Sequence, residues 1–183
     1  MRTALLLCIV MLTATAGCRK ETPAPRPMAA SQAGAPPATA PASGPGAARA
    51  FNGHWYKAVD RKVSWHEAKR LCEAMGGYLA CIESEDEQRF IATLAGGRYL
   101  YLGATDEGHE GAWEWGNGVP FTYTCWMKGQ PNNYGGAENC LATYTEGQWV
   151  DVADEGDGFW MPTGFLCEWD HAPKPQQERS EPD

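Results

Sequence analysis

The chain has 183 residues, which allows one domain of modest size together with terminal tails. Its formal net charge is -8 and the sequence has no cluster of lysine and arginine, so nucleic acid is not expected as a partner. The 21 glycines and 8 tryptophans favour an irregular, aromatic-cored domain over a helical bundle.

Residues 1–17 have the features of an export signal. Arg2 supplies the positive start, and residues 4–12 form an apolar run too short to cross a membrane. Thr-Ala-Gly then precedes Cys18, which resembles the bacterial lipobox, where such a cysteine becomes lipidated. The resemblance predicts that Cys18 anchors the exported protein in a bacterial cell envelope, and the absence of Asp after Cys18 favours the outer membrane. An ordinary cleaved signal that leaves Cys18 unmodified is the alternative.

Three further segments follow the signal. Residues 18–50 are rich in Ala, Pro and Gly and cannot bury a core, so we expect a disordered tether. Residues 51–169 carry the aromatic and periodic sequence expected of a single folded domain. Residues 170–183 are polar and contain proline, which predicts a disordered tail.

The first half of the domain predicts a strand and two short helices. Residues 51–59 alternate aromatic and polar side chains, which is typical of a strand. Ser64 and Ser84 are the expected helix N-caps, and each is followed three residues later by Glu67 or Glu87 in a capping-box pattern. Apolar residues then recur at helical spacing, and glycine pairs at 76–77 and 96–97 end both helices.

The second half predicts short strands and long loops. Residues 78–82 are expected to be extended and residues 99–104 to form a central strand. Residues 113–115 and 121–123 are expected to supply strands and core aromatics. Residues 154–158 form an acidic loop.

Oxygen-bearing side chains gather in a loop at 129–140 and a partner stretch at 148–151. Calcium takes roughly 6–8 oxygen ligands, and carboxylate and amide oxygens are suitable donors. The candidate metal ligands are Gln130, Asn132, Glu138 and Asp151. If the Gln130–Pro131 bond is cis, the two neighbouring donors project to the same side of a tight loop. A polar Gly/Asn loop without a metal is the alternative interpretation of the same residues.

A series of landmarks resembles the C-type lectin-like domain family over residues 51–169. Gln130-Pro131-Asn132 resembles the family's sugar-site tripeptide, Glu138-Asn139-Cys140 its acidic residue before a cysteine, and Trp149-Val150-Asp151 its Trp-Asn-Asp. Further matches, in the family's order, lie at residues 53–56, 68–72, 76–80, 101–103 and 165–168. The resemblance implies an α+β fold in which two helices flank small antiparallel sheets with a long loop region.

The family's primary site implies roles for the loop residues. Gln130, Asn132, Glu138 and Asp151 match four of the five positions that hold Ca²⁺ and contact sugar hydroxyls in sugar-binding members. Val150 stands at the fifth, where those members carry Asn, so one metal ligand and one sugar contact are lost together. Tyr134, in the same loop, is a candidate ring for sugar stacking, although an ordinary packed tyrosine is the alternative.

The resemblance also implies an auxiliary calcium site beside the first. Asp106 and Glu110 match its carboxylates. Asn133 and Asn139 stand where calcium-binding members often carry Asp, so reduced negative charge is expected to weaken this site. A solvated acidic loop is the alternative.

Five cysteines remain once Cys8 and Cys18 are set aside, and export permits disulfides. Cys72 and Cys167 match the family's long-range pair. Cys140 matches the first cysteine of the second family pair, whose usual partner falls near Asp154, where this sequence has no cysteine. Among the remaining cysteines we expect Cys81–Cys125, because the family rarely has cysteine at either position, with Cys125–Cys140 as the alternative. Either choice leaves one free thiol.

These observations predict an exported, calcium-dependent module that binds glycans or another surface ligand. A protein-binding lectin-like scaffold, with calcium structural or absent, is the alternative. An enzyme is disfavoured because no acid/base or nucleophile constellation is recognisable around the histidines or the odd thiol.

Overall fold

The structure is a computed structural model, and it describes residues 19–20, 47–155 and 161–173. The expected export signal, Cys18, most of the expected tether, residues 156–160 and the end of the chain beyond residue 173 lie outside the described residues. Within the described ranges, no helix has the length and apolar character needed to cross a bilayer.

Both predicted helices are present and begin at the expected caps. α1 covers Trp65–Ala74 and α2 covers Glu85–Ala95. Ser64 Oγ accepts from the Glu67 N–H at 3.2 Å, and Ser84 Oγ accepts from the Glu87 N–H at 3.3 Å. Their glutamates have other bonds: Glu67 accepts from Arg70, and Glu87 accepts from the Glu83 N–H. The serine caps therefore begin the helices, while the glutamates are used elsewhere.

The strands form one large mixed sheet and a short separate ribbon. The order across the sheet is β2 (Arg49–Phe51), β3 (His54–Val59), β10 (Gly164–Trp169), β5 (Leu100–Thr105), β8 (Cys140–Thr143) and β9 (Trp149–Val152). Two short strands join at its sides, β4 (Tyr78–Leu79) on β10 and β6 (Glu114–Trp115) on β5. The ribbon pairs β1 (Arg19–Lys20) with β7 (Tyr123–Thr124).

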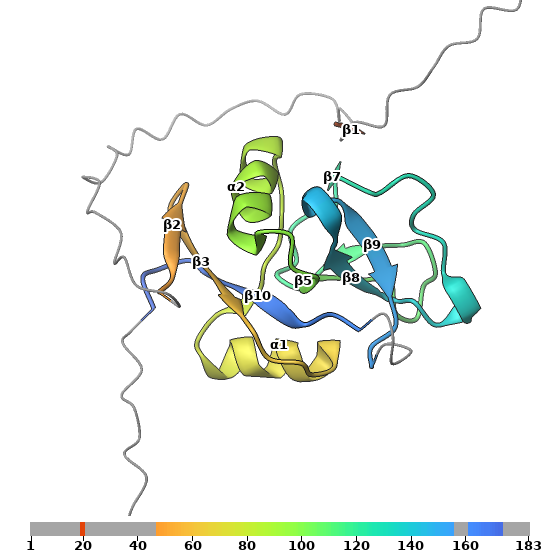
Figure 1. Cartoon of the computed structure of the whole chain (residues 1–183), viewed down its shortest axis with the longest axis horizontal. Helices are drawn as coiled ribbons and strands as arrows, with labels where there is room; N and C mark the ends of the chain where they lie inside the picture. The colour runs from red at the N-terminus through yellow and green to blue at the C-terminus, as the bar shows by residue number, and fades with distance from the viewer. Residues whose placement is uncertain (1–18, 21–46, 156–160, 174–183) are drawn as a thin grey trace, which may run out of the picture.

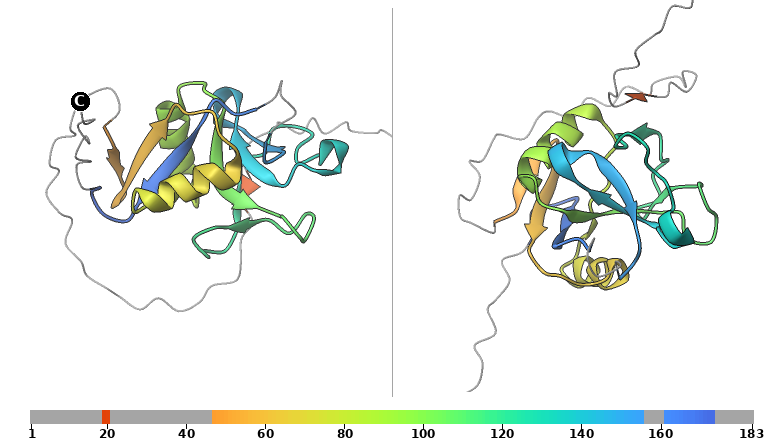
Figure 2. Two further views of the ribbon diagram at one scale, coloured as in Figure 1. Left: turned by 90° about the horizontal axis from the view of Figure 1, so that it is seen from below. Right: turned by 45° about the vertical axis from the view of Figure 1, so that its right-hand side comes forward.

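β10 is the strand that joins the two halves of the fold. It pairs antiparallel with β3 and parallel with β5, so the end of the domain lies beside its beginning. Figures 1 and 2 show α1 and α2 on opposite sides of these strands, with the loop region around η1 (Tyr134–Gly136) remote from the β2–β3 hairpin. The expected α+β fold with two flanking helices is confirmed, and the β10–β5 pair makes its sheet mixed rather than wholly antiparallel.

An aromatic cluster packs around Trp149 at the start of β9. Trp149 is fully buried, and its indole N–H donates to Gln88 Oε1 on α2 at 2.8 Å. Rings of Trp115, Phe121, Tyr123 and Trp126 lie with centroids 5.6–5.9 Å from its own. The expected core role of the aromatics at 113–115 and 121–123 is confirmed, and it fixes the strand that leads into the candidate site.

Asp154 ties the segment after β9 to α1. Its backbone carbonyl accepts from the Trp65 N–H at 3.1 Å and from the Tyr101 hydroxyl at 2.7 Å. Its carboxylate lies 2.9 Å from His66 Nδ1, and hydrogen bonding to Asp154 is the largest cause that raises the pKa of His66. Hydrogen bonds therefore hold the segment where the resemblance places a missing disulfide partner.

The cysteine arrangement differs from the expected one. Four cysteines are buried free thiols: Cys72, Cys81, Cys140 and Cys167. Cys125 is in a disulfide, and its partner is not one of these four. The expected Cys81–Cys125 bond and its Cys125–Cys140 alternative are therefore not formed. The Cys81 thiol instead donates to the Leu79 carbonyl at 3.4 Å.

Cys72 and Cys167 lie side by side although no bond joins them in the structure. A hydrogen bond with the Cys167 side chain is the largest cause that raises the pKa of Cys72, and burial adds to it. The expected disulfide between them is not formed here. The contact between α1 and β10 nevertheless places the two thiols next to each other, so that oxidation could join them in a disulfide.

Two carboxylates are buried between β3, α2 and β10. The Tyr56 hydroxyl donates to Glu87 Oε1 at 2.5 Å and to Glu168 Oε1 at 3.3 Å. His54 Nδ1 lies 2.7 Å from Glu168 Oε1, and Glu168 Oε2 accepts from the Cys81 N–H. Burial raises the pKa of both carboxyls, that of Glu168 from 4.5 to about 7.

This burial predicts that the protein loses stability as the pH rises from 5 to 8. Between pH 4.5 and 7 the folded Glu168 holds a proton that the unfolded chain releases, so its contribution is present at low pH and lost above pH 7. We expect a loss on the order of 2–3 kcal/mol in the free energy of unfolding, measured by urea denaturation.

Glu168→Gln should flatten this pH dependence, whereas Glu114→Gln, at an exposed site on β6, should retain it. Some slope should remain, because the raised pKa values of Glu87 and His66 act in the same direction. An unchanged slope in Glu168→Gln would assign the effect to other groups.

Candidate functional site

The candidate loop is held directly against β9. The Trp149 N–H donates to the Cys125 carbonyl and the Met127 N–H donates to the Trp149 carbonyl, both at 2.8 Å. The Gln130 N–H then donates to the Met127 carbonyl at 2.9 Å, and the Gln130–Pro131 peptide is cis. The loop that carries the predicted ligands is therefore positioned by the strand that carries Asp151.

The Asp151 carboxylate organises the turn after Pro131. Asp151 lies on β9 and is 2% exposed. Its Oδ2 accepts from the Asn132 N–H at 2.9 Å and from the Asn133 N–H at 2.6 Å. Because both donors are backbone groups, this carboxylate fixes the path of the loop itself.

Two other predicted ligands lie beside Asp151. Glu138 Oε2 accepts from the Tyr134 N–H at 2.8 Å, and the Glu138 N–H donates to Asn133 Oδ1 at 3.1 Å. Gln130 Oε1 is buried and has no hydrogen-bond partner among the described residues. An unpaired buried oxygen is costly unless something else satisfies it.

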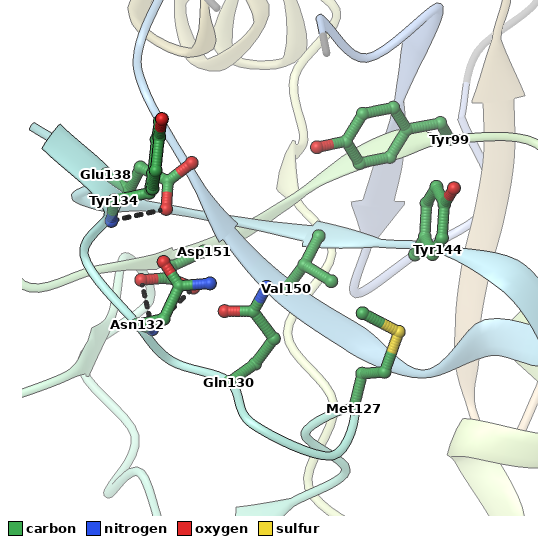
Figure 3. A pocket seen from close by; sticks show the side chains of 9 residues that line it. All are labelled: Tyr99, Met127, Gln130, Asn132, Tyr134, Glu138, Tyr144, Val150 and Asp151. Atoms are coloured by element: carbon green, nitrogen blue, oxygen red, sulfur yellow. Dashed lines mark hydrogen bonds between the residues drawn. The ribbon is translucent and has the colours of Figure 1, made fainter.

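These side chains line a cavity of about 560 Å³. Gln130, Asn132, Glu138 and Asp151 all border it, and so does Tyr134, which is 77% exposed. The same cavity is also lined by Tyr99, Met127, Tyr144 and Val150. In Figure 3 the amide oxygen of Gln130 points to the side where Asn132 and Asp151 lie, and the apolar side chains occupy the other side.

The donor set fits a calcium ion in part. It offers oxygen atoms from two carboxylates and two amides, and the unpaired Gln130 Oε1 is a donor that a cation would satisfy. Val150 is buried and offers no side-chain oxygen. Within the described ranges no group of three or more His, Cys, Asp and Glu is arranged for a metal, so a cation here depends on the amides.

The predicted auxiliary residues lie apart from the cavity lining. Asp106 is 3% exposed, and its Oδ2 accepts from the Gly111 N–H, while Oδ1 lacks a partner among the described residues. Asn133 Nδ2 donates to Glu110 Oε2 at 2.5 Å. The Asn139 carbonyl accepts from the Thr105 hydroxyl at 2.6 Å. The amide of Asn133 therefore links Glu110 to the Glu138 backbone.

The apolar half of the cavity is what the sequence did not reveal. Tyr99 is expected only as a strand residue, Val150 only as a missing ligand, and no pattern singles out Met127 or Tyr144. Met127 enters the site because its N–H pairs with Trp149, and Tyr144 because it follows β8 at the hairpin. Their convergence depends on pairing between segments distant in sequence.

Three comparisons show which known proteins the chain resembles in sequence and in fold. A chicken (Gallus gallus) hepatic lectin is 38% identical over 104 residues, which are 56% of this chain and 50% of that protein. The cow CD23 C-type carbohydrate-recognition domain, solved in the presence of a GlcNAc2Man3 oligosaccharide, superposes with a TM-score of 0.62 at 31% identity, covering 69% and 95% of the two chains. A calcium-independent type II antifreeze protein shares the fold, with a TM-score of 0.60 at 22% identity over 72% and 97% of the chains.

A family model described as "Lectin C-type domain" matches residues 61–168 of the chain. The chain therefore belongs to the C-type lectin domain family, which confirms the resemblance seen in the sequence. It spans half the length of the hepatic lectin that it matches.

Proposed function

We propose that the domain binds glycans through a calcium ion held by Gln130, Asn132, Glu138 and Asp151. When bound, calcium supplies a positive centre that coordinates two neighbouring sugar hydroxyls. The protein's own side chains would orient those hydroxyls. Glu138 would accept a hydrogen bond from a hydroxyl, and the side-chain amides of Gln130 and Asn132 could donate one. Tyr134, exposed at the rim, offers a ring face for a sugar to stack on. Binding without catalysis is the role we propose, as in the lectins that the chain resembles.

One observation carries this proposal. The four predicted oxygen donors, three from residues 130–138 and one from β9, border a single cavity in which Gln130 Oε1 lacks a partner among the described residues. The carbohydrate-recognition domain of CD23 supports a glycan as the ligand class. With an incomplete ligand set, we expect a calcium dissociation constant of about 10⁻⁴–10⁻³ M.

A protein-binding scaffold without calcium is the second candidate. Asp151 and Glu138 already accept from backbone N–H groups, and Asn133 already bridges Glu110 and Glu138. These bonds stabilise the loop without a metal. Val150 favours this candidate because it removes one ligand from the site.

A glycan array probed with and without EDTA separates the two candidates. Calcium-dependent glycan binding should disappear on chelation, and Val150→Asn should strengthen it by about tenfold. The asparagine restores an oxygen ligand for calcium and a hydrogen bond to a sugar hydroxyl, and the hydrogen bond alone contributes about 0.5–1.5 kcal/mol. Val152→Asn, also on β9 but outside the cavity lining, is the matched control and should give no gain. Binding that survives EDTA unchanged would favour the scaffold.

We also propose that the chain is exported and anchored through Cys18 to a bacterial outer membrane. Support comes from residues 1–17 and the lipobox-like residues before Cys18. The reported lectin relatives are animal proteins and lend no support to a bacterial envelope. Mass spectrometry of the mature N-terminus tests the anchor directly: a lipid on the Cys18 sulfur would support it, and a disulfide between Cys18 and Cys125, which is disulfide-bonded, would contradict it.

A further inference from the structure

We propose that the glycan bound at this site carries a compact apolar substituent, received by Tyr99, Met127, Tyr144 and Val150. The inference rests on the proposed function and names the class of ligand: a sugar that presents two hydroxyls to the oxygen donors and an alkyl or acyl group to the opposite wall. The four side chains of Tyr99, Met127, Tyr144 and Val150 form the apolar wall.

The apolar wall is continuous with the oxygen-bearing half of the cavity. Val150 and Asp151 are neighbours on β9, and Val150 stands between the two halves in Figure 3. The rings of Tyr99 and Tyr144 meet edge to face with centroids 5.3 Å apart. Together with Met127 they are half-buried and packed against the core cluster around Trp65. The wall is thus built on the core and faces the cavity.

The chemistry of this wall favours carbon over hydroxyl. A sugar hydroxyl placed against Val150 or Met127 would lose its water without gaining a good partner, which is costly. A methylene placed there gains about fourfold in affinity, since each buried CH₂ contributes about 0.8 kcal/mol. The flexible Met127 side chain can adapt to such a group.

The size of the cavity agrees with a substituted sugar. Its volume of about 560 Å³ lies within the roughly 300–1,000 Å³ of pockets that enclose ligands of drug size. Two hydroxyls coordinated by the oxygen donors would occupy the side where Gln130, Asn132 and Asp151 lie in Figure 3. The remaining volume is bounded by the side chains of Val150 and Met127 and by the two tyrosines, whose rings each carry one hydroxyl group.

The test compares matched glycosides by calorimetry on the full-length protein in 5–10 mM calcium, a range of about ten times the expected dissociation constant. The probes are galactose and mannose, each as the methyl glycoside, the butyl glycoside, and the methyl glycoside with a butanoyl ester at C6. At least one extended probe should bind about tenfold or more tightly than its methyl parent, which corresponds to about two buried methylenes. Met127→Ala should reduce the ratio of the two affinities, that of the extended probe over that of its methyl parent, by about threefold or more.

Met75→Ala is the matched control, because Met75 is also half-buried against the same cluster but does not border the cavity. It should leave the ratio as in the wild type. Equal binding of methyl and extended probes would overturn the inference while the proposed function stands. A ratio that survives Met127→Ala would also overturn it, and failure of every glycoside to bind would overturn both proposals.

Discussion

Asp151→Ala is expected to lower the free energy of unfolding by about 2–4 kcal/mol and to release the loop that follows Pro131. The carboxylate is 2% exposed and accepts from the N–H groups of Asn132 and Asn133. Alanine leaves both donors without this acceptor, and each hydrogen bond to a charged group contributes about 1.5–3 kcal/mol. The alanine variant also no longer carries the desolvation cost of a buried carboxylate, and this offsets part of that loss. Urea denaturation gives the difference.

Asp151→Asn is the matched control for this prediction. Its amide keeps one acceptor oxygen at nearly the same volume, so it should retain about half of the lost stability. Amide hydrogen exchange at residues 132 and 133 should accelerate most in the alanine variant. Wild-type stability and unchanged exchange in Asp151→Ala would show that the loop does not depend on this carboxylate.

Oxidation of the adjacent thiols Cys72 and Cys167 is the second large effect. A disulfide between α1 and β10 would close a loop over most of the domain, and the chain-entropy model gives about 4–5 kcal/mol for a loop of roughly 100 residues. The two side chains already share a hydrogen bond. We expect the oxidised protein to be more stable by this amount and to yield a linked pair of peptides that contain these residues.

The Cys125 disulfide would respond to reductant as well, so the comparison needs a variant. In Cys72→Ala/Cys167→Ala the loss of stability on reduction should shrink by about 4–5 kcal/mol relative to wild type. Peptide mapping after oxidation that finds both thiols unmodified would contradict the expected bond.

Local signals in the sequence predicted both helices and the strands β3 to β7, but not β8, β9 or β10. Ser64 and Ser84 mark both helix starts because capping depends on residues three positions apart. The same reasoning misassigned the roles of Glu67 and Glu87: Glu67 pairs with Arg70 three residues on along α1, and Glu87 accepts from Tyr56, which packing brings to it. One strand was expected over residues 51–59, and the hairpin of β2 with β3 was missed, although its turn at Asn52-Gly53, with positive φ at both residues, is a sequence signal for a hairpin.

The candidate site was predictable in its polar half only. Gln130 and Asp151 carry chemistry that a sequence displays, since oxygen donors near glycine and proline are recognisable without a structure. Met127 and Tyr144 acquire their role only when the loop pairs with Trp149 across the sheet. The predicted cysteine pairing was also wrong, because the sequence does not show which sulfur atoms meet: Cys81 and Cys125 share one core cluster, yet the Cys81 thiol donates to the Leu79 carbonyl.

Calorimetric titration of calcium into the full-length protein tests the central claim most directly, beside the same titration of Glu138→Gln. We expect binding with a dissociation constant of about 10⁻³ M or tighter, accompanied by a calcium-dependent rise in melting temperature. Both effects should be lost in Glu138→Gln, whose fold is checked by circular dichroism. Absence of binding heat and of any calcium-dependent rise in the wild type would contradict the calcium lectin and leave the protein-binding scaffold.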